Sequence, residues 1–164
     1  MTIGLLTLNL LSIAAISITV FYGIKIPEGG GAFGRHFMLA LVAAMLAVFT
    51  HTMTYFYFAG MSGNIKRAVQ EHGKGKDRLV ESRRIKAKVL PWAFGGMGLL
   101  MATFVLGGAA HTRAIPSWIH GGLGYLALIY SGVTLLVEGY YLLQQNAVAN
   151  AFQRELTGAK KHAA

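Results

Sequence analysis

The stretch FMLALVAAMLAVFTHTMTYFYF, residues Phe37–Phe58, decides the fold. It contains no Lys, Arg, Asp or Glu. At a rise of about 1.5 Å per residue, its roughly 22 residues can cross the ~30 Å hydrocarbon core of a bilayer, so the stretch predicts a transmembrane helix. Its one ionisable group, His51, lies near the middle of that helix. An unpaired polar side chain is costly at that depth, which makes His51 a candidate functional residue.

The composition of the whole chain also indicates a membrane protein. Of its 164 residues, 54% are hydrophobic and 13% are charged, and the mean hydropathy is +0.50. A soluble domain contains about 25% charged residues. The chain has no Cys, which excludes disulfides, thiolate metal sites, Cys nucleophiles and CxxCH haem attachment. The first residues lack the basic start of a secretory signal, so we expect the first apolar segment to remain as a permanent span.

The order of apolar and polar segments predicts an all-α, integral membrane four-helix bundle that forms a single membrane domain over residues 1–164. Between the second and third spans, polar helical segments are expected to project past the membrane surface and to join at the turn HGKGKD, His72–Asp77. The second and fourth spans both start near a histidine, but the two sequences are too dissimilar to indicate a duplication. The predicted elements are spans at about 3–24, 37–58, 89–110 and 118–143, a hairpin at 60–88 and a polar tail at 144–164.

The distribution of basic residues predicts the orientation of the bundle. The net charge is +9, and nine of the 15 Lys and Arg residues lie between Lys66 and Lys88. The positive-inside rule then places both termini and the basic hairpin in the cytoplasm, an N-in/C-in topology in the cell inner membrane. The basic hairpin is expected to contact anionic lipids. Nucleic acid is not expected as a partner, because the charge is explained by topology.

Three histidines lie where the predicted spans begin or end at the outer face. His36 opens the second span, His111 closes the third and His120 opens the fourth. Neutral imidazole is a good ligand for haem iron, copper or zinc, so the three are candidate metal ligands. Two histidines from facing helices at one depth suit a bis-histidine haem b, and glycines beside His111 and His120 would let a flat macrocycle approach the backbone. The alternative is that interfacial histidines lie among lipid headgroups and water.

A deeper set of polar residues consists of His51, Tyr55 one turn further along the helix, and Glu138, the only acid within any span. Together they are a candidate quinone head-group pocket, or a proton path with Glu138 as the carrier. A charged carboxylate in the membrane costs ~2.5–3.5 kcal/mol or more, so Glu138 is expected to be neutral or paired. The alternative is an interhelical hydrogen bond worth ~0.6 kcal/mol that fixes helix register. His51 alone could also be the single axial ligand of a five-coordinate haem or of a chlorophyll magnesium.

No GxGxxG, P-loop, HExxH or GxSxG motif is present, and a stand-alone enzyme is not expected. With few histidines on a four-helix bundle, the chain is similar in layout to the small haem-b anchor subunits of respiratory complexes. This similarity of architecture assigns no role to individual residues. The first hypothesis is a subunit that supports electron transfer in a larger membrane complex and binds haem b or quinone between its helices. The alternative is a non-catalytic accessory subunit that stabilises such a complex or binds lipid or pigment; a small transporter or proton channel ranks third.

Overall fold

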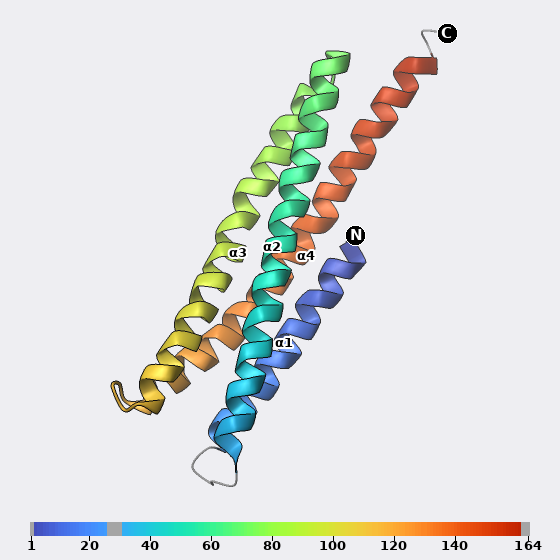
Figure 1. Cartoon of the computed structure of the whole chain (residues 1–164). Helices are drawn as coiled ribbons and strands as arrows, with labels where there is room; N and C mark the ends of the chain where they lie inside the picture. Colours follow the sequence, from blue (N-terminus) through green and yellow to red (C-terminus); the bar gives the residue numbers. More distant parts are fainter. Residues whose placement is uncertain (1, 26–30, 162–164) are drawn as a thin grey trace.

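Four long helices make up the protein (Figure 1). This computed structural model describes residues 2–25 and 31–161, with side chains as far as residue 158, so the end of the predicted tail lies outside the described residues. Each helix is long and apolar enough to cross a membrane, which confirms an all-helical bundle with four candidate spans. The helices are α1 (Thr2–Ile24), α2 (Ala32–His72), α3 (Lys76–His111) and α4 (Ser117–Lys161).

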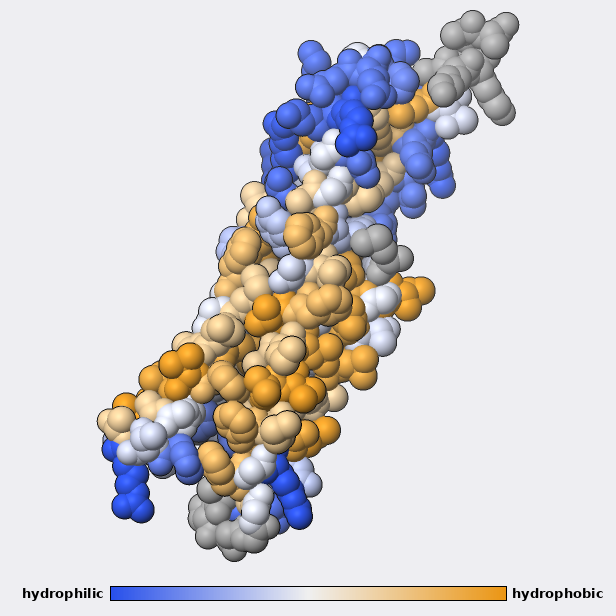
Figure 2. Space-filling model, in the orientation of Figure 1, coloured by the Kyte–Doolittle hydropathy of each residue, from blue (hydrophilic) through white to orange (hydrophobic). Residues whose placement is uncertain are grey.

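Three of the helices continue well beyond their apolar segments. The 41 residues of α2 extend for about 60 Å, twice the thickness of a hydrocarbon core. Hydrophilic residues cover the end of the molecule where α2 meets α3 and where α4 ends, whereas apolar residues cover the middle (Figure 2). We call this end the hairpin end and the opposite end, with His36, His111 and His120, the histidine end. Large apolar side chains are exposed along the spans, as a surface in contact with lipid requires.

The packing order places α2 and α4 opposite each other across the interior. Helix α1 packs against α2 and α4, and α3 also packs against α2 and α4. A smaller contact joins α2 and α4 directly, as in a bundle whose diagonal helices approach each other. Side chains that point inward from α2 and α4 therefore meet in the centre of the bundle, with α1 and α3 on either side.

The two halves of the bundle present buried residues at equivalent positions. Adding 84 to the number of a residue in α1 or α2 gives the equivalent position in α3 or α4. Positions 19, 23 and 36 thus correspond to positions 103, 107 and 120. Residue identity is kept at a few of these positions, such as His36 and His120, whereas the pattern of buried positions is kept along the whole length of the spans. The buried residues Leu5, Asn9, Ser12 and Ile16 of α1 correspond to Val89, Ala93, Gly96 and Leu100 of α3, and Ala43, Ala47, Thr50, Thr54 and Phe58 of α2 correspond to Ala127, Ser131, Thr134, Glu138 and Leu142 of α4.

The interior consists of two apolar regions separated by polar side chains. Towards the hairpin end, Leu5, Phe58, Val89 and Leu142 belong to one cluster and are all at most 4% exposed. Towards the histidine end, a second cluster contains Ile16, Leu100 and three alanines of α2 and α4. Small residues at helix contacts allow close approach of helices in lipid. The polar side chains between the two clusters form one of the two candidate sites described below.

The hairpin turn depends on two glycines with different surroundings. Gly73 and Gly75 have φ of 68° and 80°, in the left-handed region that side chains rarely adopt. A Cβ on Gly73 would contact nothing within 4 Å, whereas a Cβ on Gly75 would lie 2.3 Å from the Phe152 ring of α4. Arg78 also joins this end of α3 to α4, because its guanidinium donates two hydrogen bonds to Glu155, which raise the pKa of Arg78.

The Gly75→Ala variant should therefore be less stable than the Gly73→Ala variant. Both substitutions strain a left-handed residue by about 1–2 kcal/mol, but only Gly75→Ala also displaces the Phe152 ring. Thermal unfolding in detergent, followed by circular dichroism, should give a larger fall in Tm for Gly75→Ala. Equal falls for the two variants would contradict this packing of the turn against α4.

Candidate functional site

Two of the three predicted outer histidines face each other in the interior. His36 comes from α2 and His120 from the diagonal helix α4. Their ring centroids are 5.9 Å apart, and the ring planes differ by 80°. The bundle thus brings together two imidazoles that are 84 positions apart in the chain. We call them the histidine pair.

Each ring of the histidine pair is oriented by a backbone carbonyl of a neighbouring helix. His36 Nδ1 lies 2.9 Å from the Thr19 carbonyl oxygen of α1, and His120 Nδ1 lies 3.1 Å from the Thr103 carbonyl oxygen of α3. A carbonyl oxygen only accepts hydrogen bonds, so Nδ1 carries the proton in both rings. The remaining nitrogen, Nε2, then keeps its lone pair and can bind a metal ion. A hydrogen bond from the second ring nitrogen is the usual support of a metal-ligating histidine.

Two glycines make room for these rings. A Cβ on Gly23 of α1 would lie 3.0 Å from His36 Cε1, and a Cβ on Gly107 of α3 would lie 2.9 Å from His120 Cε1. Both distances are shorter than ordinary van der Waals contact. Each ring therefore packs so closely against the neighbouring helix that a side chain in place of the glycine would displace the ring. Both halves of the bundle thus contain, at equivalent positions, a residue whose carbonyl accepts a hydrogen bond, a glycine and a histidine.

The spacing of the two ring centroids is close to that of two imidazoles that bind one ion from opposite sides. An imidazole nitrogen lies about 2.0–2.1 Å from a bound transition metal and a little over 1 Å from its own ring centroid, so two such rings have centroids a little over 6 Å apart. The observed separation is 5.9 Å. Among the described residues, no cluster of three or more His, Cys, Asp or Glu could hold a metal ion. A zinc ion bound by this pair would therefore lack the third and fourth protein ligands of a usual site.

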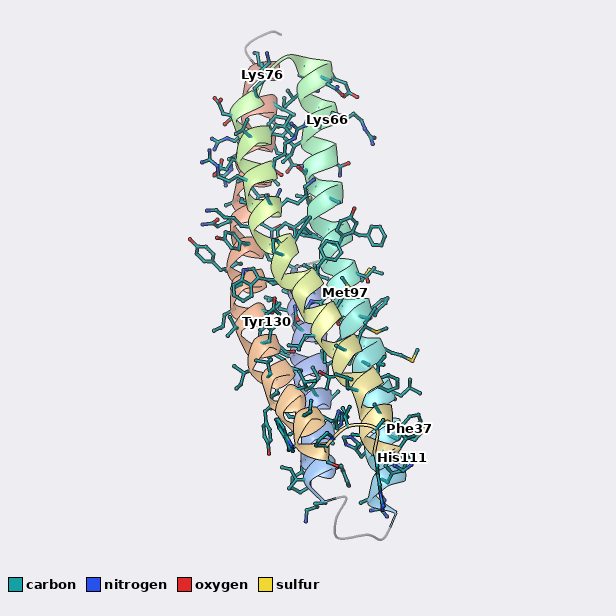
Figure 3. All side chains as sticks on the ribbon, turned by 90° about the vertical axis from the view of Figure 1, so that its left-hand side faces the viewer. Phe37, Lys66, Lys76, Met97, His111 and Tyr130 are labelled. Atoms are coloured by element: carbon teal, nitrogen blue, oxygen red, sulfur yellow. The ribbon has the colours of Figure 1, made fainter. Side chains whose placement is uncertain are left out.

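The third outer histidine lies elsewhere at the histidine end. The His111 ring stacks on Phe33 of α2, with centroids 3.9 Å apart and planes 13° apart. It lies beside Phe37 near the end of the bundle (Figure 3). His111 is exposed, and it is not one of the two rings that face each other. Its contacts are those of a residue that packs α2 against α3.

The deeper site is a hydrogen-bonded cluster around Glu138. His51 Nδ1 of α2 lies 3.0 Å from Glu138 Oε1. Asn9 Nδ2 of α1 donates to Oε2 at 2.6 Å, and Thr54 Oγ1 of α2 donates to the same oxygen at 3.3 Å. These four side chains are at most 3% exposed. We call them the Glu138 cluster; three helices contribute to it.

Further polar groups surround the Glu138 cluster on the side of the histidine end. Ser12 and Thr50 share a hydrogen bond of 3.1 Å, one turn from Asn9 and Thr54. Thr134, the equivalent of Thr50 on α4, is fully buried, and its hydroxyl has no hydrogen-bond partner among the described residues. The other edge of the His51 ring faces α3, where a Cβ on Gly96 would lie 2.9 Å from His51 Nε2. Glycine at this position lets α3 close over the imidazole.

Sequence reasoning identified the key histidines and Glu138 but not all of their partners. Tyr55 is 36% exposed and packs against Phe56 and Phe94, outside the Glu138 cluster. Thr54 occupies the inward position instead. Gly107 was among the glycines noted beside His111, whereas Gly23 and the two carbonyls were not identified as partners of the histidine pair. The equal spacing of 17 residues from Thr19 to His36 and from Thr103 to His120 could have revealed them.

Comparisons with models of known protein families, with curated proteins and with solved structures found no match.

Proposed function

We propose that this protein binds one b-type haem through His36 and His120 and carries electrons within a membrane complex. The observation that supports this most directly is the pair of facing imidazoles, whose ring centroids are 5.9 Å apart. Both Nδ1 atoms are hydrogen-bonded to backbone carbonyls. A porphyrin supplies four nitrogens to its iron and leaves two axial positions, the number of ligands that this pair offers. Haem b needs no covalent attachment, in agreement with a chain that has no Cys.

The residues near the pair also suit a large flat ligand. On the inward faces of α2 and α4, the turns that follow His36 and His120 carry Ala43 and Ala127, both buried. On α4, Gly124 precedes Ala127, and a Cβ there would meet only Val20, at 3.8 Å. Short side chains on two facing helices are what a flat ligand between them would require, and both alanines belong to the apolar cluster that contains Ile16 and Leu100. By contrast, the side chains around Glu138 are bonded to one another, so the histidine pair supports haem better than the deeper cluster supports a quinone head group.

In this proposal the chain's own residues hold and orient the cofactor. Thr19 and Thr103 fix the two imidazole rings through their carbonyls, and Gly23 and Gly107 let the rings sit against α1 and α3. When bound, the haem iron would accept and release single electrons. The donor and acceptor would be other redox subunits that contact the exposed apolar faces of the helices.

The proposed placement in the cell follows the positive-inside rule. Lys66 and Lys76 lie at the hairpin end (Figure 3), within the segment that holds most of the basic residues. We propose that this end is cytoplasmic, in contact with anionic lipids, and that the histidine pair lies towards the outer face of the cytoplasmic membrane. Cysteine-accessibility labelling at Lys74→Cys and Thr112→Cys in intact cells would test this orientation.

A reduced-minus-oxidised absorption spectrum of the native, detergent-purified protein tests the function directly. We expect the α and Soret bands of a bis-histidine haem b, at a ratio of one haem per chain. Purified protein without a haem band, after expression with sufficient haem supply, would refute the proposal. A non-catalytic accessory subunit would then be the better description of the chain.

A further inference from the structure

Glu138 is held in the interior by three hydrogen-bonding side chains. The amide nitrogen of Asn9 and the hydroxyl of Thr54 both donate to Oε2, and His51 Nδ1 faces Oε1. One proton must lie between His51 Nδ1 and Glu138 Oε1, because two acceptors cannot hydrogen-bond to each other. The protonation state of the cluster depends on the other ring nitrogen, His51 Nε2.

The net charge of the cluster depends on whether the His51–Glu138 pair holds one proton or two. With the proton on Nδ1 alone, His51 is neutral and the cluster carries one negative charge. With one more proton, shared between imidazole and carboxylate, the cluster is neutral overall. Two titratable groups this close bind protons as a pair, so the extra proton belongs to both. Binding of this proton removes the net charge of the cluster, which an apolar interior disfavours.

The groups that face Glu138 from the other helices provide no positive charge. Helix α1 contributes the neutral amide of Asn9, and α2 contributes His51 and Thr54. Helix α3 contributes Gly96, which covers His51. On α4 itself, the nearest titratable residues are Tyr140 and Tyr141 on one side and Tyr130 on the other, and none of them can carry a positive charge; the Tyr130 hydroxyl donates to the Trp92 carbonyl. Among the described residues, His51 is therefore the group that can compensate the carboxylate by taking up a proton.

Towards the histidine end, polar groups continue from the Glu138 cluster as far as Ser131, where the second apolar cluster of Ile16, Leu100 and three alanines begins. One turn towards the hairpin end, a layer of Leu5, Phe58, Val89 and Leu142 closes the interior with apolar side chains. One turn towards the histidine end lies the unpartnered hydroxyl of Thr134. Ser131 follows on the same face of α4, and it is 6% exposed. A buried polar atom with no protein partner is a usual position for internal water, and water between hydroxyls can relay a proton.

We propose that the Glu138 cluster is a proton-binding site whose proton affinity rises when one electron arrives at the histidine pair, and that the polar groups on its histidine-end side are the route by which the proton reaches it. The electron comes from a one-electron donor outside the chain, and the proton comes from water at the histidine end. This linkage rests on the proposed haem site, whereas proton binding by the cluster does not. The two sites are about 22 Å apart along α2, from His36 to His51. At that distance a unit charge changes the proton affinity about three- to fourfold at an effective dielectric constant of ~20.

Infrared difference spectroscopy tests proton binding without requiring haem. Spectra of the full-length protein in liposomes at high and low pH should show bands from a carboxyl group and an imidazole that change together. Glu138→Gln keeps the side-chain shape and an acceptor oxygen but cannot hold the charge, and it should remove these bands. Glu81→Gln, which changes a half-exposed surface carboxylate, is the matched control and should keep them. Bands that persist in a folded Glu138→Gln variant would overturn the proposal, as would their absence from the wild type.

Hydrogen–deuterium exchange of the same bands tests the direction of access. Thr134→Val removes the unpartnered hydroxyl with little change of shape and should slow exchange at least tenfold. Gln145→Met is the matched control, because Gln145 also has an unpartnered buried oxygen but lies beyond the apolar layer. It should leave the rate unchanged. Slower exchange in Gln145→Met but not in Thr134→Val would overturn access from the histidine end.

Redox titration of the haem-loaded protein tests the linkage. A three- to fourfold change in proton affinity corresponds to a total shift of about 30 mV in the midpoint potential between low and high pH, at 59 mV per tenfold for one electron. This shift should disappear in Glu138→Gln. A wild-type potential independent of pH would overturn the linkage, whereas a protein without haem but with the infrared bands would refute only the function proposed above.

Discussion

Replacing either member of the histidine pair, as His36→Ala or His120→Ala, should abolish stable haem binding. Each variant leaves a single imidazole, and the vacated side offers no replacement, because no third His, Cys, Asp or Glu joins the pair among the described residues. Changing a residue that only supports a ligand typically costs 10–100-fold in metal affinity, and loss of the ligand itself costs more. We expect less than a tenth of the wild-type haem content after purification, measured as the pyridine haemochrome per chain.

His111→Ala is the matched control for these two variants. It removes a histidine from the same end of the bundle, but one that stacks on Phe33 and does not face the pair. Its haem content and spectrum should equal those of the wild type. Added imidazole should partly restore the haem band in His36→Ala, because it can occupy the vacated space. Normal haem content in His36→Ala and His120→Ala, together with loss in His111→Ala, would contradict the assignment of the ligands.

The helices were predictable because a bilayer imposes a simple requirement on sequence. Backbone groups must be satisfied within each segment, so long runs without charge can only be spanning helices in a chain of this composition. The stretch 37–58 meets this requirement, and it lies within α2. The composition of the polar segment after this stretch also predicted helix, and residues 59–72 do continue α2 beyond the apolar run, since helical backbone is equally compatible with water.

The candidate sites were predictable in their residue types but not in their pairings. Three histidines at one depth allow three pairs, and only the diagonal arrangement of α2 and α4 selects His36 with His120. Similarly, the position of His51 leaves open whether its neighbour on α2 is Thr54 or Tyr55. The rotation of α2 about its own axis decides this, because it places Thr54 towards the interior and Tyr55 towards the surface. Such rotations depend on packing, which periodicity alone does not determine.

The two halves of the bundle are alike at the histidine pair and unlike at the Glu138 cluster. The carbonyl, glycine and histidine positions are the same in both halves, as a cofactor bound symmetrically between two rings requires. At the depth of Glu138, the equivalent residue on α2 is Thr54, and the equivalent of Asn9 on α3 is Ala93. A second carboxylate at Thr54 would repel the first across the interior. The two halves therefore differ at this depth because the interior can accommodate one carboxylate but not two.

Gly107→Val should reduce haem content at least tenfold, while Gly108→Val should leave it unchanged. The two glycines are neighbours on α3 and share its helical backbone, so the loss of glycine affects helix propensity equally in both variants. They differ in what a side chain would meet: a Cβ on Gly107 would lie 2.9 Å from His120 Cε1, and a Cβ on Gly108 would contact nothing within 4 Å. In Gly107→Val the His120 ring must move, which lengthens its hydrogen bond to the Thr103 carbonyl and misdirects Nε2.

The measurement for these glycine variants is haem content per chain together with Tm. A tenfold loss of haem affinity corresponds to about 1.4 kcal/mol. Displacing a ring that is held by one hydrogen bond and a close helix contact is expected to cost at least this much. Gly23→Val should act on His36 in the same way, because its Cβ would lie 3.0 Å from that ring. If Gly107→Val and Gly108→Val lose haem equally, the effect comes from helix packing in general. If only Gly107→Val and Gly23→Val lose it while all three variants remain folded, the glycines hold the histidine pair in its ligating position.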